Sequence, residues 1–160
     1  MINPPLRYQI LPLGSRYEIT SPTGKNHFEA PASTDKLSKI YALVDGQTVL
    51  YVGMTGQPMA NRLRGAFQAA GETGYYGYKW KALGHAIVLL IWILPDLFPR
   101  HEDREAVEAE VIFEIRNQLG YWPRWQNEMH FWNAQSTTRA IAQKIFGDIK
   151  TEVGGGTASP

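Results

Sequence analysis

The sequence predicts an α+β domain with a small central three-stranded sheet, antiparallel or mixed, that is flanked by helices. Three segments lead to this prediction. Residues 39–52 have the composition of two strands joined by a tight turn, residues 86–94 form a continuous apolar run, and residues 102–119 repeat apolar side chains at helical spacing. An extra N-terminal β element precedes these segments, and a C-terminal helix follows them.

Length and composition support a single globular domain without a membrane segment. The 160 residues are 44% hydrophobic and 19% charged, which suits a chain with an ordinary buried core. The chain has no cysteine, which excludes disulfides and thiolate sites and fits a reducing compartment, so we expect a cytoplasmic protein. The longest apolar run is too short to span a bilayer. The expected divisions are a β extension (1–35), a core (36–132), a C-terminal helix packed on the core (133–152) and a flexible tail (153–160).

The N-terminal extension has the pattern of a short β meander. Residues 7–13 and 16–20 are strand-like runs around a Gly-Ser turn, and residues 26–30 form a third short run. Pro12 makes the first run an edge strand at best, because proline cannot donate to a sheet ladder. We expect this extension to be structural.

The core begins with the clearest local signal in the chain. Residues 39–44 and 49–52 are strand-like and flank Asp45-Gly46, a pair typical of tight hairpin turns. Pro58 suits the first turn of a helix, which we expect over residues 59–70.

A ring-rich segment follows, residues 70–84, which holds Tyr75, Tyr76, Lys79 and Lys81. One hypothesis is a loop and helix start that contacts DNA, with lysines on phosphates and tyrosines on sugars or bases. The alternative is an aromatic cluster that caps the core.

The remaining segments complete the sheet and its helices. Residues 86–94 predict a central strand buried on both faces. The helix over 102–119 should stop at Gly120, and an aromatic-rich loop follows over 121–132. Ser136 can cap a final helix that reaches residue 150.

The charge distribution is uneven although the net charge is only +1. Basic side chains predominate over residues 62–81 and acidic ones over residues 102–114. Domains that bind nucleic acid often have a much higher pI, so we expect modest non-specific affinity and local recognition of phosphate.

The candidate site residues lie around the hairpin. Tyr41 and Tyr51 are on adjacent strands, and the helix brings Arg62 to the same end. Arginine binds phosphate bidentately, and its charge should lower the pKa of a nearby phenol from about 10. Glu110 lies beside the apolar stripe of the 102–119 helix, where a carboxylate needs a partner such as a metal ion or an arginine.

This stretch resembles the GIY-YIG endonuclease family over roughly residues 38–130. The first triplet of the family appears as Lys39-Ile40-Tyr41 and the second as Tyr51-Val52-Gly53. The expected helix arginine matches Arg62, the downstream helix glutamate matches Glu110, and the later asparagine matches Asn127.

The resemblance implies hydrolysis of phosphodiester bonds with Mg²⁺ or Mn²⁺ as cofactor. Arg62 would bind the phosphate, and Glu110 would hold the metal, which keeps several waters at a single carboxylate. Tyr41 or Tyr51 would orient or deprotonate the attacking water, and Asn127 would position backbone or phosphate groups.

Two departures leave the general base open. Many members of the family have His or Tyr where this chain has Ala66, and some have Lys where it has Met54. His85 and His130 are candidate substitutes, and Arg64 is a candidate second phosphate contact.

The first hypothesis is therefore a metal-dependent DNA endonuclease of restriction, repair or mobile-element type. The second is a catalytically weak or inactive DNA-binding or protein-interaction module on the same scaffold. A third is an unrelated small α/β domain. Cleavage of both strands would favour a homodimer or sequential nicking, and specificity could come from a larger protein partner.

Overall fold

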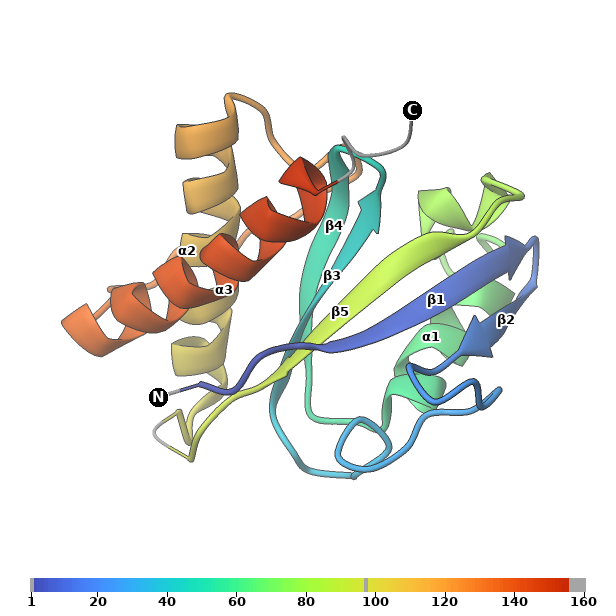
Figure 1. Cartoon of the computed structure of the whole chain (residues 1–160), viewed down its shortest axis with the longest axis horizontal. Coiled ribbons are helices and arrows are strands. Elements are labelled where there is room, and N and C mark those ends of the chain that lie inside the picture. Colours follow the sequence, from blue (N-terminus) through green and yellow to red (C-terminus); the bar gives the residue numbers. More distant parts are fainter. Residues whose placement is uncertain (1, 97, 156–160) are drawn as a thin grey trace.

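A five-stranded antiparallel sheet of order β2-β1-β5-β3-β4 forms the centre of residues 2–96 and 98–155, which the computed structural model describes (Figure 1). The strands are β1 (Leu6–Leu13), β2 (Arg16–Thr20), β3 (Lys39–Asp45), β4 (Thr48–Thr55) and β5 (Ile87–Ile93). The helices are α1 (Met59–Gln68), the 3₁₀ helix η1 (Lys79–Ala82), α2 (His101–Leu119) and α3 (Ser136–Gly154).

The sheet has five strands rather than the predicted three because the N-terminal hairpin joins it. β1 pairs with β5 over residues 6–10, for example Tyr8 with Leu89, and β2 pairs with the outer side of β1. Pro12 lies where β1 pairs with β2 alone. The third predicted run, residues 26–30, forms no strand.

The sheet separates two apolar cores. On β5, Leu89 and Ile91 face the layer that contains α1 and η1, whereas Leu90 and Trp92 face α2 and α3. This alternation explains the continuous apolar run in the sequence, because a strand covered on both faces has no solvent side. The predicted central strand is thus confirmed.

The helix boundaries follow the sequence signals closely. α1 starts directly after Pro58, and α2 ends at Gly120, whose φ of 83° is the left-handed conformation that glycine adopts easily. α3 runs to Gly154, past the predicted end and into the predicted flexible tail. Residues 156–160 of that tail lie outside the described residues.

Lys39 holds three loop carbonyls together beneath the hairpin. Its side chain is buried, and the ammonium donates to the carbonyl oxygens of Thr34 at 2.8 Å, Leu37 at 2.7 Å and Gln57 at 3.1 Å. Burial lowers the pKa of Lys39 to about 8, so the group still carries its three donors at neutral pH. The start of α1 is thereby tied to the loop that precedes β3.

In the part of the chain that the structure describes, every helix is too short or too polar to cross a membrane.

Candidate active-site cleft

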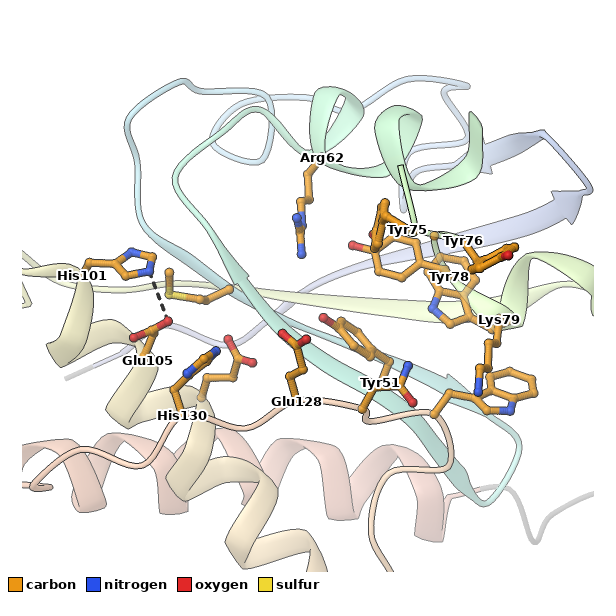
Figure 2. Close-up of a pocket in the computed structure, with 17 residues that line it drawn as sticks. Tyr51, Arg62, Tyr75, Tyr76, Tyr78, Lys79, His101, Glu105, Glu128 and His130 are labelled. Atoms are coloured by element: carbon orange, nitrogen blue, oxygen red, sulfur yellow. Dashed lines mark ion pairs between the residues drawn. The ribbon is translucent and has the colours of Figure 1, made fainter. Parts of the chain in front are cut away.

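A cleft of about 580 Å³ opens at the outer edge of the sheet, along β4 (Figure 2). Its lining comes from five segments: β4, α1, the stretch over residues 74–80, the first turns of α2 and the stretch over residues 125–130. The two helical layers on opposite faces of the sheet therefore both contribute side chains to one site.

The chain segment after α2 covers the first part of the β4 edge. The backbone N–H groups of Arg124 and Trp125 donate to the carbonyls of Val49 and Leu50 at 3.0 and 2.9 Å. The N–H of Val52 donates to Oε1 of Gln126 at 3.0 Å. The uncovered part of the edge, beyond Val52, faces the cleft.

Tyr41, Tyr78 and Arg62 form a hydrogen-bonded cluster at the base of the cleft. The hydroxyls of Tyr41 and Tyr78 lie 2.6 Å apart, and Nε of Arg62 donates to the Tyr41 hydroxyl at 3.1 Å. The guanidinium also lies over the Tyr78 ring, 5.9 Å from its centroid. Among the described residues, none accepts a hydrogen bond from the two terminal nitrogens of Arg62, so these remain available to a ligand. Figure 2 shows Arg62 pointing into the cleft.

Gly53 makes room for the tyrosine pair. It lies directly opposite Tyr41 on the neighbouring strand, and a Cβ atom there would be 2.6 Å from the Tyr41 ring and 2.7 Å from that of Tyr51. The two rings pack with their centroids 6.0 Å apart. The glycine of the second triplet is therefore required by packing.

Arg62 acts on the phenol pKa values in the expected direction, but the net pKa of each phenol is raised and not lowered. Burial raises the pKa of Tyr41 and of Tyr51 above the ordinary value of 10.0, and the opposing effect of Arg62 is smaller. Burial likewise raises the pKa of Tyr78. These hydroxyls stay protonated at neutral pH, so they serve as hydrogen-bond donors and not as bases.

Glu108 is one of three carboxylates in the described lining of the cleft, with Glu105 and Glu128, whereas the predicted Glu110 is not among them. Glu110 lies 3.9 Å from Arg139 of α3. Two residues along a helix correspond to a rotation of roughly 200°, so only one of the two can point into the cleft.

The pKa of Glu108 reflects its partial burial and its position beside Met54 on the edge strand β4. Partial burial raises its pKa to about 7, and Arg62, whose charge acts in the opposite direction, does not cancel this effect. The neighbouring carboxylate of Glu105 also raises this pKa, and a hydrogen bond from the backbone of Met54 lowers it. The backbone of Met54, the next residue after Val52 whose N–H points outward from this edge, therefore has the carboxylate of Glu108 as its partner.

His101 and Glu105 lie on the face of α2 that also carries Glu108, and they form an ion pair when the imidazole is protonated. Nε2 of His101 lies 3.2 Å from Oε1 of Glu105, and the indole N–H of Trp132 donates to the other oxygen of Glu105 at 2.8 Å. Both members of the pair line the cleft (Figure 2). The carboxylate therefore fixes the orientation of the imidazole ring at the mouth of the cleft.

Other predicted residues divide into those that line the cleft and those that do not. Tyr51, Arg62, Tyr75, Tyr76, Lys79, Asn127 and His130 line it. Tyr41 lies beneath it in the core and reaches it through its bond to Arg62.

Three predicted auxiliary contacts lie elsewhere. Nε2 of His85 is 3.0 Å from Asp45, at the turn of the β3–β4 hairpin. Arg64 lies by a separate hollow beside β2. Lys81 turns inward and donates to the backbone oxygens of Ala69 at 2.5 Å and Tyr76 at 3.1 Å, so its role in this structure is to hold the loop.

The sequence did contain a signal for the residues of α2 that were missed. His101, Glu105 and Glu108 stand at positions i, i+4 and i+7, the spacing of side chains on one helix face. This polar face lies next to the apolar stripe. Glu110 is predicted because it borders the stripe and matches the downstream helix glutamate of the resembled family, whereas the sequence pattern favours a solvated position for Glu108. Tyr78 carried no comparable signal, because its role depends on where a loop returns to the sheet.

Comparison of the chain with protein-family models, curated proteins and solved structures gave no match.

Proposed function

We propose that the chain is a divalent-metal-dependent DNA endonuclease that hydrolyses phosphodiester bonds at a site of GIY-YIG type, in restriction, repair or mobile-element processes. One observation carries the proposal: a guanidinium anchored on a buried tyrosine and a half-buried carboxylate share one open cleft. A phosphodiester needs these two kinds of group, a fixed cation for its oxygens and an acidic ligand for a metal ion.

Arg62 is the phosphate-binding residue in this proposal. Its Nε is fixed on Tyr41, and Tyr41 raises its pKa further, so the group is always charged and its terminal nitrogens can take two phosphate oxygens. Tyr51 lines the same cleft with a protonated hydroxyl and would donate a hydrogen bond to the phosphate.

Glu108 fits the role of metal ligand better than any other single carboxylate. Its raised pKa marks a carboxylate that a cation would stabilise, because the charged form is poorly solvated. A single carboxylate leaves most coordination positions to water, which suits Mg²⁺ because this ion keeps several of its waters. When bound, Mg²⁺ or Mn²⁺ would supply positive charge to the non-bridging phosphate oxygens.

His101 is the proton acceptor in this proposal, since the phenols of the site stay protonated. The water oxygen bonds to phosphorus, its proton passes to the free nitrogen of His101, and the bond to the leaving oxygen breaks. Glu105 stabilises the imidazolium that results. Solvent returns a proton to the leaving oxygen.

A second candidate is a catalytically weak or inactive DNA-binding or protein-interaction module on the same scaffold. The raised pKa values of the three tyrosines favour it, because they remove the phenolate that the resemblance implies as a base. The two candidates differ in whether DNA is cut.

The deciding experiment is cleavage of supercoiled plasmid and single-stranded DNA with Mg²⁺, with Mn²⁺ and with EDTA. Glu108→Gln is compared with Glu110→Gln, a matched change two residues along the same helix. We expect metal-dependent cleavage that Glu108→Gln slows roughly 100-fold or more and that Glu110→Gln leaves nearly unchanged. His101→Gln should slow cleavage and remove the rise of rate with pH on the acid side.

The cleavage experiment distinguishes the proposed nuclease site from the non-catalytic module. Cleavage at the wild-type rate in Glu108→Gln would exclude the proposed site. Binding of DNA without cleavage, under every metal condition, would favour the non-catalytic module.

A further inference from the structure

Aromatic side chains from three segments line the cleft. Tyr75 is 50% exposed and Tyr76 is 70% exposed, and these two rings form one rim of the cleft. Tyr51 of β4 and Trp125 of the segment after α2 also line it. Exposed rings of this size are unfavourable in water, so a gathering of them marks a binding surface.

The rim that carries Tyr76 is held in a fixed shape. The ammonium of Lys81 ties the carbonyl of Tyr76 to that of Ala69 at the end of α1. The Tyr76 ring lies so close to Gly71 that a Cβ there would be 2.3 Å from it, and φ at Gly71 is 92°. The loop therefore holds the Tyr76 ring in one position before a ligand binds. This preorganisation reduces the conformational entropy that the protein loses when a ligand stacks on the ring.

The charge of the cleft does not suit a DNA duplex. Among its described lining residues two are basic, Arg62 and Lys79, and three are carboxylates, Glu105, Glu108 and Glu128. Duplex binding depends on neutralising many phosphates, and this lining can neutralise few. A single strand also carries one phosphate per nucleotide, but its unpaired bases can stack on aromatic rings and gain binding energy that the paired bases of a duplex cannot.

One buried donor in the cleft wall also lacks a partner. The indole N–H of Trp80 is the sole buried side-chain polar atom without a hydrogen bond among the described residues, and Trp80 is 0% exposed and lines the cleft. Trp80 stacks on Tyr78 at 4.7 Å, so the aromatic surface continues from the cleft into the core. Tyr78 and Trp80 therefore support the aromatic lining of the cleft from the core side.

We propose that the cleft binds the unpaired bases of a single-stranded nucleic acid, which stack on the aromatic rings of its lining while Arg62 contacts one phosphate. This inference rests on the proposed function and narrows its substrate to single strands or to unpaired segments of a duplex. The cleft volume of about 580 Å³ lies within the range of sites that enclose small organic ligands.

The test measures binding without cleavage. Fluorescence anisotropy in EDTA compares a labelled single strand of about 16 nucleotides, the RNA strand of the same sequence, and the matching DNA duplex. We expect at least tenfold tighter binding of a single strand than of the duplex, with a shallow dependence on salt. The two single strands distinguish DNA from RNA as the source of the bases.

Aromatic variants locate the binding surface. Tyr75→Ala and Tyr76→Ala should each weaken single-strand binding roughly 5- to 100-fold, whereas Tyr76→Phe should keep it because the ring remains. Phe113→Ala is the matched control, since Phe113 is 48% exposed on α2 and is absent from the described lining of the cleft. Circular dichroism of each variant checks that it is folded.

Tighter binding of the duplex would overturn this inference and leave the proposed nuclease intact if plasmid is cut. Unchanged single-strand binding in both alanine variants would also overturn it. Preference for single strands without cleavage in Mg²⁺ would support the inference and contradict the proposed catalysis instead.

Discussion

Interactions of opposite sign determine the pKa of the Glu108 carboxyl group. Partial burial disfavours its charged form, whereas Arg62 and the Met54 backbone favour it, and burial is the larger effect. The group therefore titrates near neutral pH, where a small change in its surroundings alters its charge.

This titration predicts a dependence of folding stability on pH. The pKa of Glu108 rises from 4.5 to about 7 on folding, so the folded protein binds this proton more tightly than the unfolded chain does. The stabilisation is complete below about pH 4.5 and is lost as the pH rises through about 7. We expect a loss of roughly 1 to 3 kcal/mol, reduced from the full value because the side chain keeps some solvent contact.

Urea unfolding at a series of pH values measures this effect. Glu108→Gln should remove this part of the dependence, and the variant should be the more stable protein at pH 8. Glu110→Gln should retain the wild-type dependence. A wild-type stability that stays constant between pH 5 and pH 8 would contradict the assignment.

At the scale of single residues, the sequence was sufficient to predict that Tyr41, Tyr51 and Arg62 lie together. It was not sufficient to predict the pKa of the phenols. Tyr41, Tyr51 and Arg62 come together because a hairpin and the helix after it are local structures with strong signals. The pKa of a phenol depends on how many atoms of distant segments cover it. Tyr78 and Trp80 supply that cover from a loop that no local pattern could place.

At the scale of elements, Lys39 connects two loops at the start of β3. Its ammonium donates to three carbonyl oxygens of these loops. The β3 strand thus begins with a connection to both the preceding loop and the start of α1.

Removal of this connection should destabilise the domain. Lys39→Met keeps most of the side-chain volume but leaves buried carbonyls without their donor, and we expect a loss of roughly 1 to 3 kcal/mol. Thermal unfolding measures it. Lys25→Met is the control, because the ion pair of Lys25 with Glu29 is exposed at the surface and should contribute less than about 1 kcal/mol. Equal losses in the two variants would show that the buried carbonyls find other donors.

Element positions were more predictable than the sheet that they build. The helices over 59–70, 102–119 and 136–150 and the strand over 86–94 match α1, α2, α3 and β5 within a few residues, because apolar spacing and Gly or Pro stops are local properties. The joining of β1 to β5 depends on two segments about 80 residues apart in the chain. No periodicity in either segment identifies the other as its partner.

At the scale of the whole molecule, one sheet supports two cores that should unfold together. Alternate residues of β3 and β5 enter opposite cores, so loss of either core removes half of the contacts of the same strands. Ile145→Ala on the α3 side and Leu63→Ala on the α1 side each truncate a fully buried side chain. Each should cost about 2 to 5 kcal/mol.

Unfolding followed by two spectroscopic probes tests whether the two cores unfold together. Far-ultraviolet circular dichroism and tryptophan fluorescence should give the same transition in both variants, as for a two-state domain. A fluorescence transition that precedes the loss of helix in Leu63→Ala alone would show that the layers unfold separately.

The segment over residues 124–126 has a consequence for solubility. An apolar strand with an open edge is a template on which further copies of a chain can add as extra strands. The hydrogen bonds from Arg124 and Trp125, and the Gln126 side chain on Val52, occupy that edge as far as the cleft. The same few residues that give the cleft one of its walls therefore also protect the protein from edge-to-edge aggregation.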